Sequence, residues 1–291
     1  MAEMINKPQR PAVSVMMPVY NGRKYIDASV QSLINQTFAD WECIIVNDGS
    51  TDGTAEYLAA ITDPRFRIVT LQKNCGRATA REKALSLATG EFLAMLDAED
   101  VYHPEKLERQ VRLMRENQSV ALVSCSICSF GTKCDILYKR PVKPGLYQFD
   151  RELPSHASSM LRTDRAKMFH YNPMLNYSED VDFLRQYLTG QKFMVTADVL
   201  YYYSEIDSVT KGKLISYYKN GVAHGLSKII PGVKLFVVNG LKYLVGSVVY
   251  PWIDIRRILL KRGVPLTEAE RSEYESAVTP LINKQIINEQ K

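Results

Sequence analysis

Residues 13–54 read VSVMMPVYNGRKYIDASVQSLINQTFADWECIIVNDGSTDGT, and this stretch decides the class of fold. It opens with a short apolar run at 13–17 that ends at Pro18, which is typical of a buried strand. Apolar side chains then recur at helical spacing over residues 22–36, and a second apolar run follows at 42–46. The stretch is therefore predicted to form a strand, a helix and a second strand.

The same alternation continues toward the middle of the chain. We expect helices at 52–61, at 77–88 and from Pro104 onward, with strands at 66–71 and 91–96 between them. Repeated alternation of strand and helix is the pattern of a sheet covered by helices on both faces. The sequence therefore predicts an α/β fold with a doubly wound, mostly parallel, Rossmann-like sheet.

Polar residues follow each of the four predicted strands. Ligands of doubly wound sheets bind at the carboxyl ends of the strands, so these polar clusters are expected along one edge of the sheet. The clusters are Pro18–Asn21, Asn47–Ser50, Lys73–Arg77 and Asp97–Asp100.

Composition and motifs exclude several classes of protein. The 291 residues are 46% hydrophobic and 24% charged, which excludes a collagen-like or mainly disordered chain. No G-x-G-x-x-G follows the first strand and no G-x-x-x-x-G-K-[ST] occurs, so neither a dinucleotide-binding loop nor a P-loop is expected. Cys125 and Cys128 form a C-x-x-C, but no second pair follows at zinc spacing, so free thiols are expected.

Four segments, in this order, carry a resemblance to a known family: residues 13–38 of the stretch quoted above, ECIIVNDGSTDGT at 42–54, NCGRATAREKAL at 74–85 and GEFLAMLDAEDVYHPEKLE at 90–108. They resemble the inverting family-2 glycosyltransferases with the GT-A fold, closely over residues 12–120 and more loosely to residue 212. The resemblance implies a nucleotide-diphosphate sugar as donor, with UDP as the expected nucleotide.

The resemblance also implies a nucleotide-sugar site. Tyr20 would cover the base, Asp48 would accept a hydrogen bond from the uracil imide N–H, and Arg81 would lie near the phosphates. The alternatives are that Tyr20 packs in the interior, that Asp48 caps the next helix and that Arg81 is a charge on a helix surface. The implied set is Pro18, Val19, Tyr20, Asn21, Asp48, Asn74, Gly76, Arg77, Arg81 and Asp97.

Asp97-x-Glu99 stands where the family carries its D-x-D motif. The resemblance implies that Glu99 ligates a divalent cation directly and that Asp97 lies near the metal or the ribose. Carboxylates are suitable ligands for Mg²⁺ or Mn²⁺, and such a cation neutralises a leaving diphosphate. Glutamate in place of the second aspartate is a departure from the motif, and a solvated turn is the alternative.

The resemblance implies a general base in the second half of the chain. Residues 177–184, YSEDVDFL, resemble the acidic motif that opens a helix in the family. Asp180 would take the proton of the acceptor hydroxyl, and Glu179 would support it or contact the sugar. Acids also decorate helix N-termini because of the helix dipole, which is compatible with this role.

One loop departs from the family pattern. Many relatives carry Tyr-Arg-x-His there, whereas this chain has Tyr203 in place of the arginine and Glu205 in place of the histidine. Glu205 is a third candidate metal ligand, with a solvated loop acid as the alternative. The Q-x-x-R-W signature of processive synthases is absent, which favours transfer of a single sugar.

The positive charge gathers near the end of the chain. The whole sequence carries +5, but residues 211–262 hold ten Lys and Arg against the single acid Asp254, among many apolar side chains. Such a segment is suited to the surface of an anionic membrane. The alternatives are packing on the catalytic domain or on a second copy of the chain, as a homodimer, or a transmembrane helix at 235–253. Residues 266–291 predict a polar terminal helix.

These observations give a domain organisation and a function. Residues 1–215 would form the catalytic domain, with a nucleotide-binding half at 1–120 and an acceptor-binding half at 121–215. Residues 216–291 would form a basic, apolar, helical appendage. The start of the chain has no apolar h-region, so we expect a cytoplasmic enzyme, peripheral at the inner face of the cell membrane.

The expected reaction adds one sugar to a glycan or lipid-linked acceptor in cell-surface polysaccharide biosynthesis, without a nucleic acid partner. Two alternatives remain open. The first is transfer onto polyprenyl phosphate, whose anionic oxygen needs no general base. The second is a donor-binding partner subunit that has lost catalysis.

Overall fold

The structure is a computed structural model that describes residues 10–131, 136–150, 152–175, 178–204 and 263–289. The chain divides into two compact units by its internal contacts. The first contains residues 1–127, 141–203 and 267–291, and the second contains residues 128–140 and 204–266. The predicted boundary between residues 215 and 216 lies outside the described residues, so the two predicted domains stay a prediction.

The second unit is described only in part. The end of β6 (Val120–Phe130) pairs antiparallel with β7 (Ile136–Lys139), through Cys128 opposite Lys139 and Ser129 opposite Tyr138. Lys139 also forms an isolated antiparallel bridge with Val264.

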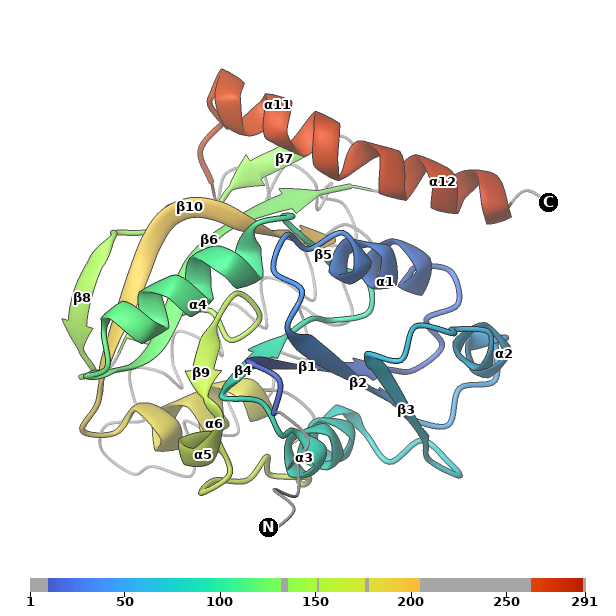
Figure 1. The fold of residues 1–291 in the computed structure, drawn as a ribbon, viewed down its shortest axis with the longest axis horizontal. Coiled ribbons are helices and arrows are strands. Elements are labelled where there is room, and N and C mark those ends of the chain that lie inside the picture. The colour runs from blue at the N-terminus through green and yellow to red at the C-terminus, as the bar shows by residue number, and fades with distance from the viewer. Residues whose placement is uncertain (1–9, 132–135, 151, 176–177, 205–262, 290–291) are drawn as a thin grey trace, which may run out of the picture. The chain divides into compact units, whose positions relative to one another are not determined.

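The first unit is built around one sheet with the strand order β3-β2-β1-β4-β9-β6-β10-β5, and β8 pairs with β10 (Figure 1). Strands β3, β2, β1 and β4 are parallel, whereas β9 is antiparallel to β4 and β6, and β5 to β10. The strands not yet defined are β1 (Val13–Val19), β2 (Trp41–Asn47), β3 (Phe66–Thr70), β4 (Phe92–Met95), β5 (Val101–Tyr102), β8 (Gly145–Gln148), β9 (Met160–Arg162) and β10 (Lys192–Ser204).

The predicted doubly wound sheet is therefore confirmed, and its parallel half is the part that carries the four polar clusters. All four clusters lie at or just after the carboxyl ends of neighbouring parallel strands, at one edge of the sheet. The antiparallel half extends the sheet beyond β4 and brings in strands from residues 101–204. The sheet is mixed because the strands of this second half pair antiparallel with their neighbours.

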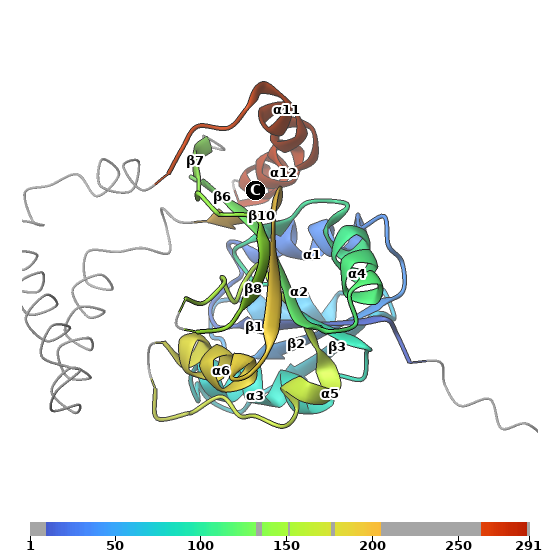
Figure 2. The same ribbon diagram turned by 90° about the vertical axis from the view of Figure 1, so that its left-hand side faces the viewer.

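Helices cover both faces of this sheet (Figure 1, Figure 2). Alternate residues of β1 point to opposite faces, so Val15 and Met17 belong to one apolar core and Met16 to the other. The first core includes side chains of α1 (Ile26–Ile34), α2 (Thr54–Ala59) and α4 (Lys106–Glu116). The second includes those of α3 (Arg77–Leu87), α5 (Thr163–Ala166) and α6 (Glu179–Leu188).

The end of the chain forms two helices where the sequence predicts one. Helix α11 (Glu268–Ala277) starts with a capping box between Thr267 and Glu270, and α12 (Thr279–Glu289) follows after Val278. Helix α12 packs along α1 (Figure 1). Tyr274 and Val278 are buried, so these helices complete the apolar interior of the first unit.

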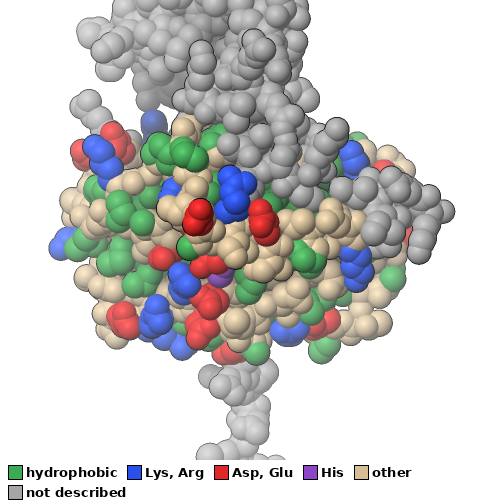
Figure 3. Space-filling view, turned by 90° about the horizontal axis from the view of Figure 1, so that it is seen from above, with side chains coloured by type: hydrophobic (Ala, Val, Ile, Leu, Met, Phe, Trp, Pro, Cys, Tyr) green, Lys and Arg blue, Asp and Glu red, His purple; other side chains and the backbone are tan. Residues whose placement is uncertain are grey.

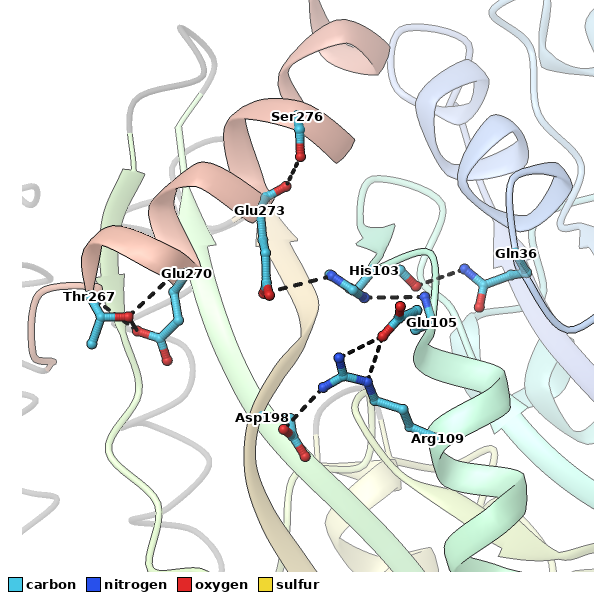
Figure 4. Close-up of polar contacts among 9 residues, drawn as sticks. All are labelled: Gln36, His103, Glu105, Arg109, Asp198, Thr267, Glu270, Glu273 and Ser276. Carbon is cyan, nitrogen blue, oxygen red and sulfur yellow. Dashed lines mark hydrogen bonds and ion pairs between the residues drawn. The ribbon is translucent and has the colours of Figure 1, made fainter.

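A polar network joins α11 to the segment that precedes α4 (Figure 4). The Glu273 carboxylate lies 3.8 Å from Nε2 of His103, whose carbonyl accepts a hydrogen bond from Gln36 at 2.8 Å. Burial lowers the pKa of His103 although the Glu273 charge opposes that shift, so the imidazole is neutral at pH 7. Tyr274 of the same helix packs edge to face on Tyr202 of β10, with ring centroids 5.3 Å apart.

Candidate functional site

The acidic loop, residues Asp97–Asp100 after β4, is held by its own backbone and by a serine of α1. The Asp100 amide donates to the Asp97 carbonyl at 3.0 Å. The Ser29 hydroxyl, which is fully buried, lies 2.7 Å from the Ala98 carbonyl and 2.6 Å from that of Asp100. Asp97 and Glu99 remain partly exposed in this loop, so their carboxylates are accessible to a ligand.

Arg81 of α3 joins the acidic loop to α6. Its guanidinium donates to the Asp97 carboxylate at 3.1 Å and to the Glu179 carboxylate at 2.8 Å, and the residue is only 3% exposed. Burial alone would lower the pKa of Arg81, but the surrounding carboxylates, Asp97 first, raise it above its usual value. The interpretation of Arg81 as a surface charge is therefore wrong: it is a buried cation between two acids from distant parts of the chain.

The predicted acids of α6 differ in their surroundings. Glu179 is 4% exposed, and burial raises its pKa although the Arg81 charge opposes the shift. Asp180 is half-buried, and one of its carboxylate oxygens accepts a hydrogen bond from the Val181 amide at 2.9 Å. Both occupy the first turn of α6, as the alternative based on the helix dipole also requires. Glu179 thus belongs to the same cluster as Asp97 through Arg81, and the charge of Asp180 also acts on that guanidinium.

Two further side chains of this cluster were not predicted. Nε2 of His156 lies 2.7 Å from the Tyr171 hydroxyl, and Tyr171 stacks on Phe183 of α6 with ring centroids 4.2 Å apart. Burial, followed by the positive charge of Arg81, lowers the pKa of His156 to about 3. The imidazole is therefore neutral at physiological pH. No local sequence signal distinguishes a buried histidine, so the motifs did not identify His156.

Asp48 binds the loop that precedes α3. It is 3% exposed, and its carboxylate accepts hydrogen bonds from the Cys75 amide at 2.7 Å and from the Gly76 amide at 2.8 Å. The alternative that Asp48 caps the next helix is wrong, because Asp52 accepts from the Thr54 amide at the start of α2. A carboxylate has about four acceptor positions, so Asp48 retains capacity for a donor from a ligand.

The loops after β1 and β2 are tied together beside Asp48. The Asn21 amide donates to the Ser50 hydroxyl at 2.9 Å, and the Asn21 side chain accepts from the Thr51 amide at 2.8 Å. Pro18 and Val19 end β1, and Tyr20 projects from this end with 48% of its surface exposed. The alternative that Tyr20 packs in the interior is therefore wrong.

The remaining predicted residues of the nucleotide site lie at the start of α3. The Asn74 side chain accepts from the Gly76 amide at 3.1 Å, and Gly76 has a φ of 92°, which favours glycine. Arg77 follows at the first position of the helix. Desolvation alone would lower its pKa, but the nearby charges of Asp97 and Glu99 raise it. The charges of the acidic loop therefore act on a second arginine.

The carboxylates that could hold a cation lie in the acidic loop. Within the described residues, no group of three or more His, Cys, Asp or Glu side chains could hold a metal ion by itself. Asp97 and Glu99 nevertheless fit Mg²⁺ or Mn²⁺, because such ions are commonly bound by one or two carboxylates together with substrate phosphates. Glu205, the third predicted ligand, lies outside the described residues.

A comparison with models of protein families identifies the family of this sequence. Residues 14–175, more than half of the chain, match the model described as glycosyl transferase family 2. That range covers the parallel half of the sheet, Arg81, the acidic loop and His156. It ends shortly before Asp180.

Several proteins of related sequence carry glycosyltransferase names. An uncharacterised glycosyltransferase of Methanocaldococcus jannaschii is 31% identical over 74% of this chain and 80% of its own. A putative teichuronic acid biosynthesis glycosyltransferase of Bacillus subtilis, TuaG, is 45% identical over 37% of this chain and 43% of its own. An Escherichia coli UDP-Glc:α-D-GlcNAc-diphosphoundecaprenol β-1,3-glucosyltransferase, WfgD, is 39% identical over 36% of this chain. The last two matches span less than half of those relatives.

Solved structures share the fold at low sequence identity. The mannosyltransferase PcManGT of Pyrobaculum calidifontis, in complex with GDP-Man and Mn²⁺, matches with a TM-score of 0.59 at 16% identity, over 96% of this chain and 81% of its own. Staphylococcus aureus TarS residues 1–349 in complex with UDP match with a TM-score of 0.56 at 21% identity, over 82% of this chain and 73% of that one. Four ordered strand-end clusters, the Arg81 cluster and these matches lead to one conclusion: the chain is a glycosyltransferase that belongs to glycosyl transferase family 2 and has the GT-A fold.

Proposed function

We propose that this enzyme transfers a single sugar, with inversion, from a UDP-sugar to a lipid-linked or glycan acceptor in surface polysaccharide biosynthesis. The observation that carries the proposal is the position of Arg81 between Asp97 and Glu179. This ion-pair cluster joins an acid of the donor side to the helix that carries the candidate base. The charged groups proposed to act on the donor and those proposed to act on the acceptor therefore lie in one cluster.

The donor nucleotide would bind where the loops after β1 and β2 meet. Tyr20 is exposed at this point, so its ring is available to cover a base. Asp48 is fixed by two backbone amides, which leaves an acceptor oriented for an imide N–H. An imide N–H occurs in uracil and not in cytosine, and this favours UDP. The name of the relative WfgD also contains a UDP-sugar donor.

The diphosphate would lie beside the acidic loop and the start of α3. Asp97 and Glu99 would hold Mn²⁺ or Mg²⁺ there, and the cation would neutralise charge that develops on the leaving diphosphate. Arg77 would add a positive charge on the same side, since the charges of both acids act on it. The name of PcManGT includes Mn²⁺, which agrees with this assignment.

The acceptor hydroxyl would be deprotonated by Asp180. Glu179 is engaged by Arg81, whereas Asp180 keeps one carboxylate oxygen without a hydrogen-bond partner among the described residues. A partly exposed carboxylate that is not neutralised by an ion pair can accept a proton from a bound hydroxyl. Glu179 would act by holding Arg81 and the start of α6 in place.

The test of this function is release of UDP. The purified enzyme, incubated with a panel of UDP-sugars and Mn²⁺, should release UDP, and EDTA should abolish the release. Glu99→Gln, which removes a charged metal ligand, should lower the rate by a factor on the order of 10². Glu116→Gln, at the exposed end of α4, should behave as wild type. Release that is unaffected by EDTA would contradict the metal assignment. Release of UDP from none of the donors would contradict the proposed use of a UDP-sugar.

Membrane attachment through the basic segment 211–262 is part of the proposal. This segment lies outside the described residues. Its net charge of +9 follows from the sequence. On the face seen in Figure 3, acidic and basic side chains of the described residues are interspersed. None of the described helices combines the length and apolar character that crossing a bilayer requires. The undecaprenol in the name of WfgD fits an acceptor at a membrane.

Attachment predicts sedimentation with vesicles. The full chain should sediment with vesicles that contain phosphatidylglycerol and remain in solution with purely zwitterionic vesicles. Replacing the closely spaced Arg256, Arg257, Lys261 and Arg262 by glutamine should weaken anionic binding by a factor of up to about 10³, since each basic residue near such a surface contributes about 1 kcal/mol. A full chain that never sediments with anionic vesicles would rule out this attachment.

A further inference from the structure

A single tyrosine hydroxyl connects both ends of the acidic loop. Tyr201 of β10 is fully buried, and its hydroxyl donates to the Asp100 carboxylate at 2.6 Å. The same oxygen accepts a hydrogen bond from the Asp97 amide at 3.3 Å. Asp97 and Asp100 are the first and last residues of the loop, so one side chain from a strand about 100 residues later holds both ends.

The direction of these two bonds is determined by the groups involved. A backbone amide can only donate, so the Tyr201 oxygen must accept from Asp97, and its own proton is left for the Asp100 carboxylate. Burial, and next the Asp100 charge, raises the pKa of Tyr201 well above its usual value. The hydroxyl therefore stays protonated throughout the physiological range and keeps this arrangement.

The ring of Tyr201 is fixed by its neighbours. Strand β5 pairs with β10 so that Tyr102 stands opposite Tyr201, and the two rings pack edge to face with centroids 5.6 Å apart. The Tyr102 hydroxyl bonds to the Met95 carbonyl at the end of β4. On the other side of the loop, Ser29 contacts two of its carbonyl groups. The loop is thus held from α1 and from β10 together.

Of the contacts described above from α1 and β10 to this loop, the one from Tyr201 reaches Asp97, whose side chain binds Arg81. The Asp97 amide is bound to Tyr201, and the carboxylate of the same residue is bound to Arg81 at 3.1 Å. Removing the hydroxyl would free the amide and leave the Asp97 backbone to rotate against its ion pair. Ser29 acts further along the loop and cannot replace this bond.

We infer that Tyr201 is a positioning residue of the donor site, and that its hydroxyl sets the orientation of Asp97 and Glu99 toward a bound nucleotide diphosphate. This rests on the proposed function, in which these two acids lie at the diphosphate. The role is indirect: Tyr201 contacts no substrate and acts through the loop backbone.

The first test measures the loop itself. In Tyr201→Phe, hydrogen–deuterium exchange of a peptide covering residues 96–101 should rise by about tenfold or more, while core peptides of β1 and β2 stay protected. The matched control is Tyr187→Phe: that tyrosine is also fully buried, and its hydroxyl also donates once and accepts once, to the Ala121 carbonyl and from the Arg162 amide. Equal exchange of residues 96–101 in the two variants would overturn the inference.

The second test measures the donor site. UDP should bind Tyr201→Phe in the presence of Mn²⁺ about tenfold more weakly than wild type, with little change when EDTA replaces the metal. Tyr187→Phe should bind UDP as wild type does. Unchanged Mn²⁺-supported binding in Tyr201→Phe would overturn the positioning role even if its exchange rises.

The two readouts separate this inference from the proposed function. A wild-type enzyme that binds UDP equally well with and without Mn²⁺ would contradict the proposed metal site, and exchange would still decide whether Tyr201 orders the loop. Asp100→Asn is a second, milder variant, because its amide oxygen can still accept from the Tyr201 hydroxyl. It should give exchange and UDP affinity between those of wild type and Tyr201→Phe, and values at or beyond those of Tyr201→Phe would contradict the assigned bond.

Discussion

Replacing Asp180 by asparagine should lower sugar transfer by a factor on the order of 10² or more, the scale of losing a general base, while UDP binding remains as in wild type. The amide cannot take a proton from the acceptor hydroxyl at neutral pH. Its size and its hydrogen bond from the Val181 amide can be retained, so the fold should not change. The measurement is the rate of transfer and the affinity for UDP of the same preparation.

Asp182→Asn is the matched control for this variant. Asp182 also lies in the first turn of α6, where its carboxylate accepts from the Gln186 side chain at 3.0 Å. Both substitutions remove one negative charge near the helix N-terminus, so a role of the helix dipole alone predicts similar, small effects for the two. A base predicts a large loss for Asp180 only. Wild-type transfer by Asp180→Asn would instead favour an acceptor that is already an anion, such as a polyprenyl phosphate.

Replacing Arg81 by methionine should destabilise the enzyme by about 3–5 kcal/mol, the range for removing one partner of a buried ion pair. The side chain of Arg81 is 4% exposed and that of Glu179 is 5% exposed, so the variant would leave buried negative charge without a cation. Urea unfolding at neutral pH measures the loss. Arg115→Met is the control, because its ion pair with Glu91 is about half exposed and should contribute about 1 kcal/mol or less.

The loss should become smaller as the pH falls. In wild type, Arg81 helps to keep the pKa of Asp97 below its usual value, so that pair stabilises the fold at neutral pH and is lost in acid. Without Arg81, burial raises the pKa of both carboxyls in the folded state. The folded variant then binds more protons than the unfolded chain, so its free energy of unfolding increases as the pH falls toward the ordinary pKa of a carboxyl group. A difference from wild type that is constant with pH would show that Glu179 and Asp97 do not carry the effect.

The arrangement of the first half of the fold follows from local sequence. Apolar runs of four or five residues alternate with helical spacing, and turn residues separate them, so strands β1–β4 and helices α1–α4 could be predicted with ends shifted by a few residues. The sequence did not predict β5, because two residues have no periodicity. It also did not predict the break at Val278, which separates α11 from α12.

The candidate site could be predicted only as a set of residue types. Asp48 and Asp97 were predicted to lie at one site because parallel strands end at one edge of a sheet, whereas the role of Asp180 was implied by the family resemblance. Which neighbour each side chain meets depends on packing between elements far apart in the chain. Asp48 was expected to contact a ligand or the next helix, and it is bound by the amides of the loop before α3.

What the sequence by itself determined is therefore the kind of sheet, the edge at which ligands are expected and the acids at that edge, since these depend on local periodicity and chain order. The tertiary structure alone decided that Arg81 points inward to Asp97 and Glu179, that His156 is kept neutral, and that Tyr201 holds the acidic loop. The physical reason is that burial and ion pairing depend on which surfaces meet. Residues 81 and 179, or 100 and 201, are neighbours in the folded chain only.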